Sequence, residues 1–401
     1  MRNFCLTSGG ASKNCVLSYQ NYIGVRMQNP FQYGKVVSEP YFTDREEEYL
    51  RLMDDVQNRH NVVLYSPRRY GKTSLLMKLA KHMAANGFNV VYLDFYRVGC
   101  KEDFIELYSR EIMVQYSGRW KSTLKKLSAL LKGIRPMMSL DPMGNTSLSI
   151  AIEASGNLHE SLESVINLPE NLDDKARWLI IFDEFQEISK LNGDGFDDIL
   201  RSHIQHHKRC SYIFSGSRYH LLLDLFNKPS KAFYRFGKVM QLPKIPAPYM
   251  QKFIIERYAS TGISLDHKLA DMIIERVENI PNYVQYLASE LWNLAYQANL
   301  EPTIALLERA LINLIDGLND YFFKLWDDLS PVQKKVLIGL IADRSNPYSQ
   351  EFMQRHGLGA ISSTQRSLEK LIASELITKE GSIYRFTDPL FRLFLQLRIS
   401  A

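Results

Sequence analysis

The sequence predicts an α/β domain built on a parallel sheet, followed by two mainly helical regions. Short apolar runs alternate with helical patterns between about residues 61 and 242, as strands and crossover helices do in parallel sheets. Apolar residues then recur at helical spacing from about residue 248 to 326. The chain has 401 residues, which is enough for two or three domains of roughly 150 residues each.

The composition is that of a globular protein. Hydrophobic residues make up 45% and charged residues 23% of the chain, which excludes disordered, collagen-like and disulfide-rich classes. The net charge of +5 neither requires nor excludes a polyanionic partner. No apolar stretch approaches the ~20 residues that cross a bilayer, so we expect no membrane partner. The four cysteines are scattered without a CxxC pair, which favours a reducing cytoplasm.

The first 26 residues show neither helical nor strand periodicity. They carry Arg2, Lys13 and Arg26 without an acidic residue, and polar residues interrupt them too often for a signal peptide. An ordered pattern begins at Met27. We therefore expect residues 1–26 to be a disordered leader or a mis-assigned start, with a short ordered arm as the alternative.

The α/β region is expected to open with a helix near residue 45. Thr43 or Asp44 is its expected N-cap, and the acidic residues 46–48 suit its first turn. Strands are expected at 61–65, 88–94, 178–183 and 211–215, with a further apolar run at 239–242, and helices at about 102–116 and 196–207. An insertion at about 115–175 contains a basic helical segment, 119–135, and a hairpin within 137–154.

Residues 66–73, SPRRYGKT, match the phosphate-binding pattern GxxxxGK[ST] except that Ser66 replaces the first glycine. The motif follows a predicted strand and opens a predicted helix, which is the context that a phosphate loop needs. Its backbone amides would surround the phosphates, Lys72 would contact the β and γ phosphates, and Thr73 would hold Mg²⁺. The expected nucleotide-binding residues are Ser66, Pro67, Arg68, Arg69, Tyr70, Gly71, Lys72, Thr73 and Ser74.

A second element, LIIFDE at 179–184, is an apolar strand that ends in two acids, which is a Walker B pattern. Asp183 would orient a water on Mg²⁺ and Glu184 would polarise the attacking water. The strand that ends in SGSR places Ser215 or Ser217 at the same edge, where one of them would sense the γ-phosphate. Arg235, in AFYRFG, would reach phosphate in its own or a neighbouring subunit, with a surface ion pair as the alternative.

The C-terminal region predicts a winged helix-turn-helix. Three short helices follow Ser330, and two β-type runs then meet across Glu380 and Gly381. The resulting domains are 27–247 for the α/β core, 248–329 for a helical lid and 330–401 for the winged helix. In the latter, Gln365, Arg366 and Lys370 would face a DNA groove, unless the domain serves only as a protein contact.

Seven segments together resemble a known family, namely NPFQYG, FTDREEE, SPRRYGKTSLL, LIIFDEFQEI, YIFSGS, AFYRFG and FTDPLFRLFL. They resemble the archaeal-type ATPases of the STAND branch of AAA+ P-loop NTPases, over about residues 29–398. The resemblance implies an ATP-binding switch with a helical lid and a winged helix. It makes Pro281, in ENIPNYVQYL, the proline that packs on adenine, with Asn279 at the position of a family glycine.

These observations predict an ATPase with ATP and Mg²⁺ as cofactors. Nucleotide state would move the lid and the winged helix against the core, with nucleotide-dependent homo-oligomers as a further expectation. Two alternatives stay open, a nucleotide-binding signalling scaffold with little hydrolysis and a DNA-associated, initiator-like ATPase. The cluster of His203, His206, His207 and Cys210 is interpreted as a polar helix face and not as a metal site.

Overall fold

The computed structural model describes residues 27–37, 40–115, 126–140, 146–152, 157–343 and 346–399. The predicted leader and the first part of the basic segment, residues 119–125, lie outside them. The chain divides into two compact units. The sheet unit comprises residues 32–252 and 274–285, and the helical unit comprises residues up to 31, 253–273 and 286–401. The predicted limits of core, lid and winged helix stay predictions.

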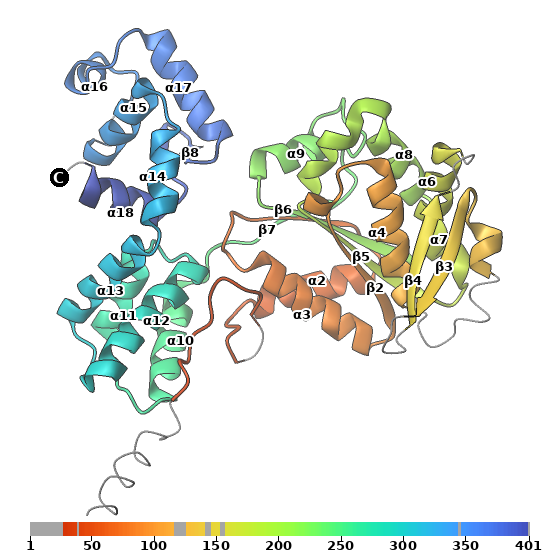
Figure 1. The fold of residues 1–401 in the computed structure, drawn as a ribbon, viewed down its shortest axis with the longest axis horizontal. Coiled ribbons are helices and arrows are strands. Elements are labelled where there is room, and N and C mark those ends of the chain that lie inside the picture. The colour runs from red at the N-terminus through yellow and green to blue at the C-terminus, as the bar shows by residue number, and fades with distance from the viewer. Residues whose placement is uncertain are drawn as a thin grey trace, which may run out of the picture. The chain divides into compact units, whose positions relative to one another are not determined.

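A five-stranded sheet forms the centre of the sheet unit (Figure 1). Its strands are β1 (Val62–Tyr65), β2 (Phe88–Asp94), β5 (Arg177–Asp183), β6 (Cys210–Gly216) and β7 (Lys238–Gln241). Neighbouring strands are parallel, in the order β2, β5, β6, β1, β7. The prediction of a parallel α/β sheet is therefore confirmed.

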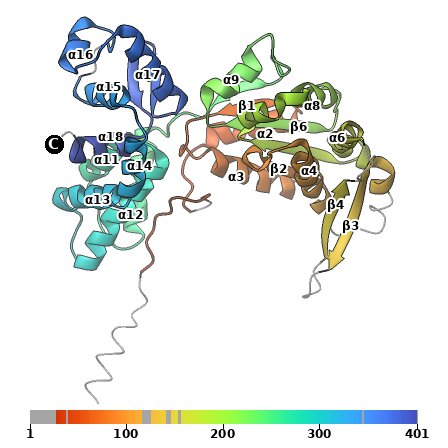
Figure 2. The same cartoon turned by 45° about the horizontal axis from the view of Figure 1, so that its top comes forward.

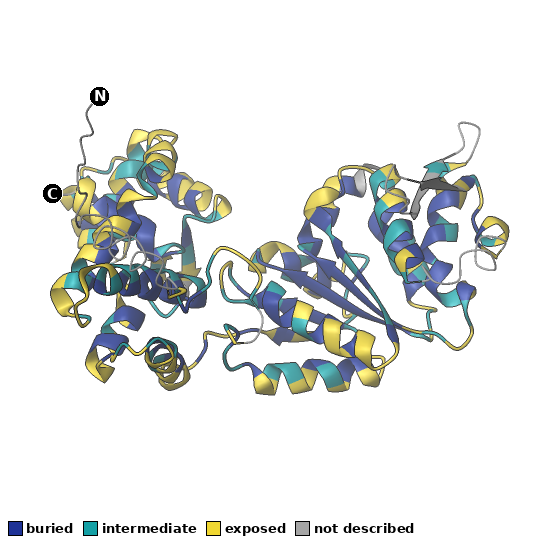
Figure 3. Cartoon of the chain, turned by 60° about the horizontal axis from the view of Figure 1, so that its bottom comes forward, coloured by how far each residue is buried: buried dark blue, intermediate teal, exposed yellow. Residues whose placement is uncertain are grey.

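Helices cover both faces of the sheet (Figure 3). They are α2 (Glu46–Gln57), α3 (Lys72–Ala85), α4 (Lys101–Val114), α6 (Leu158–Ile166), α7 (Leu168–Leu172), α8 (Phe196–Ile204) and α9 (Tyr219–Asn227), with 3-10 helices η1 (Phe95–Arg97) and η2 (Phe185–Asp194). Because side chains alternate along a strand, Ile181 and Ile213 pack with α2 and α3. Phe182 and Phe214 pack with α4, α6, α8 and α9 on the other face. The strands buried on both faces are mainly apolar, as in other parallel sheets.

The start of α2 differs from the prediction. The helix begins at Glu46, and its N-cap is Arg45, whose φ is 79° and whose side chain makes no capping hydrogen bond. The predicted N-caps, Thr43 and Asp44, are therefore wrong. Arg45 is 2% exposed, and its guanidinium donates to the carbonyl of Tyr70 at 3.1 Å. This tertiary contact fixes the local backbone in place of a side-chain cap.

The insertion contains an antiparallel hairpin of β3 (Ile134–Leu140) and β4 (Thr146–Ile152). It forms its own two-stranded sheet outside the central one (Figure 2). The predicted hairpin is confirmed, but β3 begins at Ile134, three residues before the predicted start, so the last two residues of the predicted basic helix are strand. The turn at 141–145 lies outside the described residues.

The topology creates a ligand-binding edge at the carboxyl ends of β1 and β6. From β1 the chain crosses through α3 toward β2, whereas it passes from β6 through α9 to β7 in the opposite direction. Right-handed crossovers then place α3 and α9 on opposite faces of the sheet, and the two cores agree with this. Ligands of open α/β sheets bind at such a change of direction.

The helices after residue 246 are α10 (Ala247–Ala259), α11 (His267–Arg276), α12 (Pro281–Ala298), α13 (Ile304–Asp316), α14 (Asn319–Asp327), α15 (Pro331–Ala342), α16 (Gln350–Arg355), α17 (Ile361–Ala373) and α18 (Pro389–Arg398). A Ser330 capping box starts α15. Helices α15 to α17 precede the hairpin β8 (Ile377–Glu380) and β9 (Ile383–Phe386), as predicted. In the described part of the chain, no helix combines the length and apolar character needed to cross a membrane.

Candidate nucleotide-binding site

The predicted phosphate loop connects β1, which lies between β6 and β7, to the N-terminus of α3. Ser66 is fully buried, and its amide donates to the carbonyl of Gly216 on β6 at 3.3 Å. Two loop residues lie in the left-handed region, Arg69 with φ of 71° and Gly71 with φ of 90°. Such turns direct successive amides inward, and the first turn of a helix adds further unpaired amides. The loop therefore has the form of an anion site.

Arg45 supports the loop from α2. Besides the Tyr70 carbonyl, its guanidinium contacts Glu48 at 3.0 Å, and the Glu48 side chain is itself mostly buried. Burial lowers the pKa of Arg45, and Glu48 opposes this shift. Arg45 was not among the predicted site residues, because nothing in the local pattern shows that an arginine at a helix start points inward.

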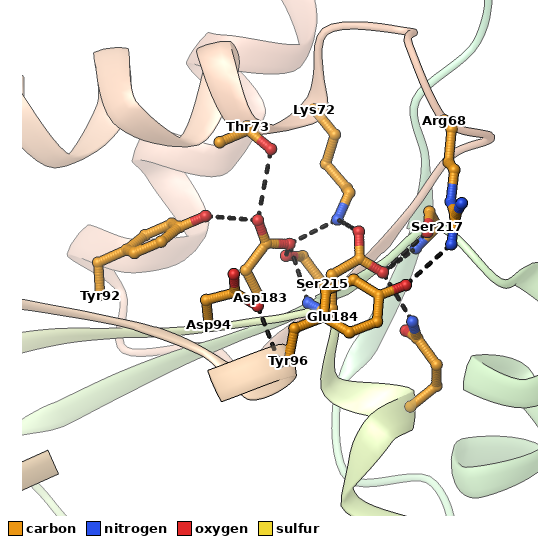
Figure 4. A network of polar contacts seen from close by, with 11 residues as sticks. Arg68, Lys72, Thr73, Tyr92, Asp94, Tyr96, Asp183, Glu184, Ser215 and Ser217 are labelled. Carbon is orange, nitrogen blue, oxygen red and sulfur yellow. Dashed lines mark hydrogen bonds and ion pairs between the residues drawn. The ribbon is translucent and has the colours of Figure 1, made fainter. Parts of the chain in front are cut away.

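Lys72 and the two acids of the Walker B pattern form the centre of the site (Figure 4). The Lys72 Nζ lies 2.5 Å from Oδ1 of Asp183 and 3.2 Å from Oε1 of Glu184. Lys72 is 6% and Asp183 4% exposed. A buried ammonium so close to two carboxylates compensates their charge, which burial alone would make costly.

Asp183 accepts further hydrogen bonds from neighbouring strands and from α3. The hydroxyl of Ser215 and the amide of Glu184 donate to Oδ1. Thr73 Oγ1 lies 3.4 Å from Oδ2, and the hydroxyl of Tyr92 donates to the same oxygen at 2.5 Å. The structure thus brings the two predicted metal ligands, Thr73 and Asp183, next to each other.

Glu184 is held in a turn directly after β5. Its φ is 50°, in the left-handed region, so its carboxylate returns to the side of Lys72. Both the amide and hydroxyl of Ser217 donate to Oε2, at 3.2 and 2.8 Å, and Gln186 Nε2 donates to it at 2.6 Å. Gly216 lies against Gln186, since an added Cβ would come within 2.2 Å of Gln186 Oε1.

Both predicted sensor serines therefore reach the site, with different partners. Ser215 binds Asp183, and Ser217 binds Glu184. Tyr92 and Gln186 also reach the site and were not among the predicted site residues. The sequence did hold a signal for Tyr92. Side chains alternate between the two faces of a strand, and residues 90 and 92 of β2 share the face that packs on α3.

The electrostatics keep both acids ionised. Burial acts to raise the pKa of Asp183, but Lys72, together with hydrogen bonds from Ser215 and Tyr92, holds that pKa below its usual value. The pKa of Glu184 is lowered in the same way, against burial, by Lys72, Gln186 and Ser217. Burial and the nearby Asp183 raise the pKa of the Tyr92 phenol, so Tyr92 remains a hydrogen-bond donor.

Asp94, at the end of β2, is a third acid beside the site. It pairs in register with Asp183, and burial, with the charges of Asp183 and Glu184, raises its pKa. Its Oδ1 accepts the amide of Tyr96 at 2.9 Å, and the Tyr96 hydroxyl accepts from Arg68 of the loop at 2.9 Å. This connection links the loop to the carboxyl end of β2 (Figure 4).

Pro281 begins α12 close to the phosphate loop. The amide of the next residue, Asn282, donates to the carbonyl of Arg69 at 3.3 Å, and the Arg69 guanidinium lies 4.7 Å from the centre of the Tyr283 ring. Asn279 has φ of 53°. Asparagine tolerates this region better than most residues. This explains why Asn279 can occupy the position at which the resembled family has a glycine.

Arg235 is not part of this network. Its guanidinium lies 5.1 Å from the centre of the Tyr234 ring and is exposed. Its backbone amide donates to the carbonyl of Phe226. Among the described residues it has no ion-pair partner, so the structure does not bring it to the phosphate loop of its own chain.

The site fits a nucleotide with a magnesium ion. Mg²⁺ prefers hard oxygen ligands and is usually held by one or two protein groups besides phosphates. Thr73 Oγ1 and Asp183 Oδ2 are such oxygens, 3.4 Å apart. The loop amides and Lys72 supply donors for phosphate. Fold and site together therefore define a nucleotide-binding protein of the P-loop class.

Comparisons with known proteins identify the families of two segments of the chain. Residues 42–225 match a family model described as "ATPase domain predominantly from Archaea", and residues 320–397 match one described as "Probable winged helix domain". Residues 42–225 therefore carry an archaeal-type ATPase domain and residues 320–397 a winged helix domain, and the chain is thus a P-loop ATPase. A search of curated proteins finds no match.

Two solved structures are similar over nearly the whole chain. A Walker-type ATPase of Pyrococcus abyssi is 16% identical, with a TM-score of 0.64, and the match covers 92% of this chain and 99% of that one. The ORC2 protein of Aeropyrum pernix, in its ADP form, is 14% identical, with a TM-score of 0.51, and the match covers 92% and 100%. These similarities concern the fold.

Proposed function

We propose that this protein is a Mg²⁺-dependent ATPase of the STAND type, in which nucleotide state controls the lid and the winged helix. The observation that carries the proposal is the position of Lys72, whose ammonium contacts Asp183 and Glu184 at once. A single buried cation thus connects the phosphate loop with both acids. When a nucleotide binds, its phosphate would replace the two acids as the partner of the Lys72 ammonium.

The binding roles follow from the chemistry of each group. The amides of residues 66–74 and Lys72 hold the phosphates, and Pro281 packs on the base. Thr73 and Asp183 hold Mg²⁺, which, when bound, neutralises charge on the phosphate oxygens. Ser215 keeps Asp183 in its rotamer through their hydrogen bond.

Glu184 is the proposed general base. Its carboxylate remains ionised and accepts hydrogen bonds from Ser217 and Gln186 on one oxygen. Departure of Lys72 toward phosphate would leave Oε1 available to accept a proton from the attacking water. Orientation by two fixed donors supports this role, because a general base must lie within hydrogen-bond reach of the proton it takes.

Coupling to the helical unit is supported by α12. This helix has its first residues in the sheet unit, where Asn282 donates to the carbonyl of Arg69. Its residues from 286 onward belong to the helical unit. A change in the conformation of the phosphate loop on phosphate binding would therefore act on α12, which has residues in both units.

Two variants test the proposal. Lys72→Ala should abolish ATP binding, whereas Glu184→Gln should keep binding and lose hydrolysis. Binding is measured by calorimetry and hydrolysis by phosphate release. Glu187→Gln is the matched control, because Glu187 is a buried acid of the same segment whose ion pairs are with Lys190 and Arg218. Unchanged turnover in Glu184→Gln would contradict its role.

Arg235 is proposed to act on the nucleotide of a neighbouring copy in a homo-oligomer. Its exposure supports this role, as does the need for a cation near the γ-phosphate. Mixing Arg235→Ala with Lys72→Ala should restore part of the lost hydrolysis, since each variant supplies the group that the other lacks. No recovery in the mixture would place Arg235 outside the reaction.

Duplex DNA binding by the winged helix is the second candidate function. Arg366 and Lys370 lie one turn apart on α17, are exposed, and have no ion-pair partner among the described residues. Replacing both by Ala should weaken binding and flatten its salt dependence between about 50 and 200 mM. Absence of duplex binding at low salt with ATP would favour a protein contact for this domain.

A further inference from the structure

The two oxygens of Asp183 have separate sets of partners. Oδ1 accepts from Lys72 at 2.5 Å, from the amide of Glu184 at 3.0 Å, and from the hydroxyl of Ser215. Oδ2 faces only Tyr92 and Thr73 among the described polar contacts. Thr73 lies on the Oδ2 side of the carboxylate, so a cation that also binds Thr73 would meet Oδ2, even after Lys72 has moved from Oδ1 to phosphate.

Tyr92 occupies the approach to that oxygen. Its hydroxyl lies 2.5 Å from Oδ2 and also interacts with the hydroxyl of Thr73. Its ring packs with the core that α2 and α3 form, so the position of the hydroxyl is fixed by the sheet. In Figure 4 the Tyr92 hydroxyl points at Asp183, with Thr73 beside both.

We propose that Tyr92 is a positioning residue that competes with the divalent cation for Oδ2 of Asp183. The inference rests on the proposed Mg²⁺ site at Thr73 and Asp183. A phenol proton and a cation are attracted to the same lone pairs, so the cation has to displace the hydrogen bond. Tyr92 then holds Asp183 in place when the metal is absent and lowers the affinity of the site for the metal.

The test is a Mn²⁺ titration of the full-length protein with ADP, followed by electron paramagnetic resonance of the free ion. Protein is kept in excess over ADP, so that little free nucleotide binds the metal. Tyr92→Phe keeps the ring and removes the donor, and it should bind Mn²⁺ about fivefold more tightly, as expected for the loss of one competing hydrogen bond. Tyr92→Met, which lacks both ring and hydroxyl, should change the affinity in the same direction.

Tyr49→Phe is the matched control. Tyr49 is a partly buried tyrosine of the same core that packs on His82, and its substitution should leave Mn²⁺ affinity unchanged. Equal or weaker Mn²⁺ binding by Tyr92→Phe would overturn the inference. Failure of the metal site itself is distinguishable, because Thr73→Ala would then bind Mn²⁺ as wild type does.

Discussion

Charged side chains serve different purposes at the sheet edge and on the winged helix. At the sheet edge, Lys72 is buried between two carboxylates. On α17, Arg366 and Lys370 are exposed and have no ion-pair partner in the described part of the chain. Burial strengthens each interaction and fixes its geometry, whereas exposed charges are screened by water and salt. The buried arrangement fixes the positions of the groups that would contact a ligand. The exposed arrangement provides only a general attraction to negative charge.

The largest expected effect is the loss of stability when the buried Lys72 is removed. Without nucleotide, Lys72→Ala leaves Asp183 and Glu184 buried without their cation, which should lower the free energy of unfolding by about 3 kcal/mol. Urea denaturation at pH 7 measures it. Because Lys72 lowers the pKa of both acids, their contribution is present above the unfolded pKa values and is lost as pH falls. The deficit of the variant should therefore shrink as pH falls below about 4, and a deficit that is constant with pH would contradict this account.

The same contrast explains what the sequence could predict. Lys72, Thr73, Asp183 and Glu184 belong to short motifs whose chemistry depends on neighbours in the chain, and parallel strands bring their ends to one edge. Tyr92 and Arg45 act through contacts between elements distant in sequence. Neither residue has a motif, so their roles required the packing of β2 and α2 against the loop.

The helices and strands show the same difference between features set by local sequence and features set by contacts with distant segments. The predicted strands end within one residue of the observed ones because each contains a short apolar run with a polar residue on either side. The N-cap of α2 was wrong because capping preferences are local, and the burial of Arg45 outweighs them. A sequence pattern therefore predicts what one segment prefers, and contacts with other segments decide the exceptions.

A partly buried histidine of the sheet unit provides a prediction for a neutral group. His207 is bonded to Tyr212 and Asn167, at 2.6 and 3.0 Å, and burial lowers its pKa to about 4. Between pH 6.5 and 4 the unfolded chain binds a proton that folded His207 does not, so stability should fall with falling pH by up to about 3 kcal/mol. His207→Gln should flatten this part of the stability curve, measured by thermal unfolding.

The surface residue His60 is the control for this effect. It is mostly exposed beside Asp55, so His60→Gln should keep the slope between pH 6.5 and 4. If His207→Gln kept the full slope, other groups would have to account for it.

Helix α2 allows a buried arginine, Arg45, to be compared with an exposed one, Arg51. Arg45→Gln removes a buried donor from the Tyr70 carbonyl and leaves Glu48 without its cation. The free energy of unfolding should fall by about 2 kcal/mol, and ADP should bind more weakly because the loop loses its support. Arg51→Gln, which breaks an exposed pair with Glu47 on the same helix, should change stability by less than about 0.5 kcal/mol. Equal effects of the two variants would contradict the distinction between buried and exposed arginines.

The smallest expected effect belongs to the winged helix. Replacing Arg366 and Lys370 together by Ala removes two exposed charges, while the buried face of α17, which includes Leu368 and Leu371, keeps its packing. Alanine favours a helix at least as well as either residue. The free energy of unfolding should thus change by less than about 0.5 kcal/mol, measured by urea denaturation without nucleotide. Leu371→Ala, on the opposite face of the same helix, should cost about 3 kcal/mol. A large loss in the double variant would mean that these charges support the fold of the domain, and the contrast with Lys72 would then lie in their partners and not in their burial.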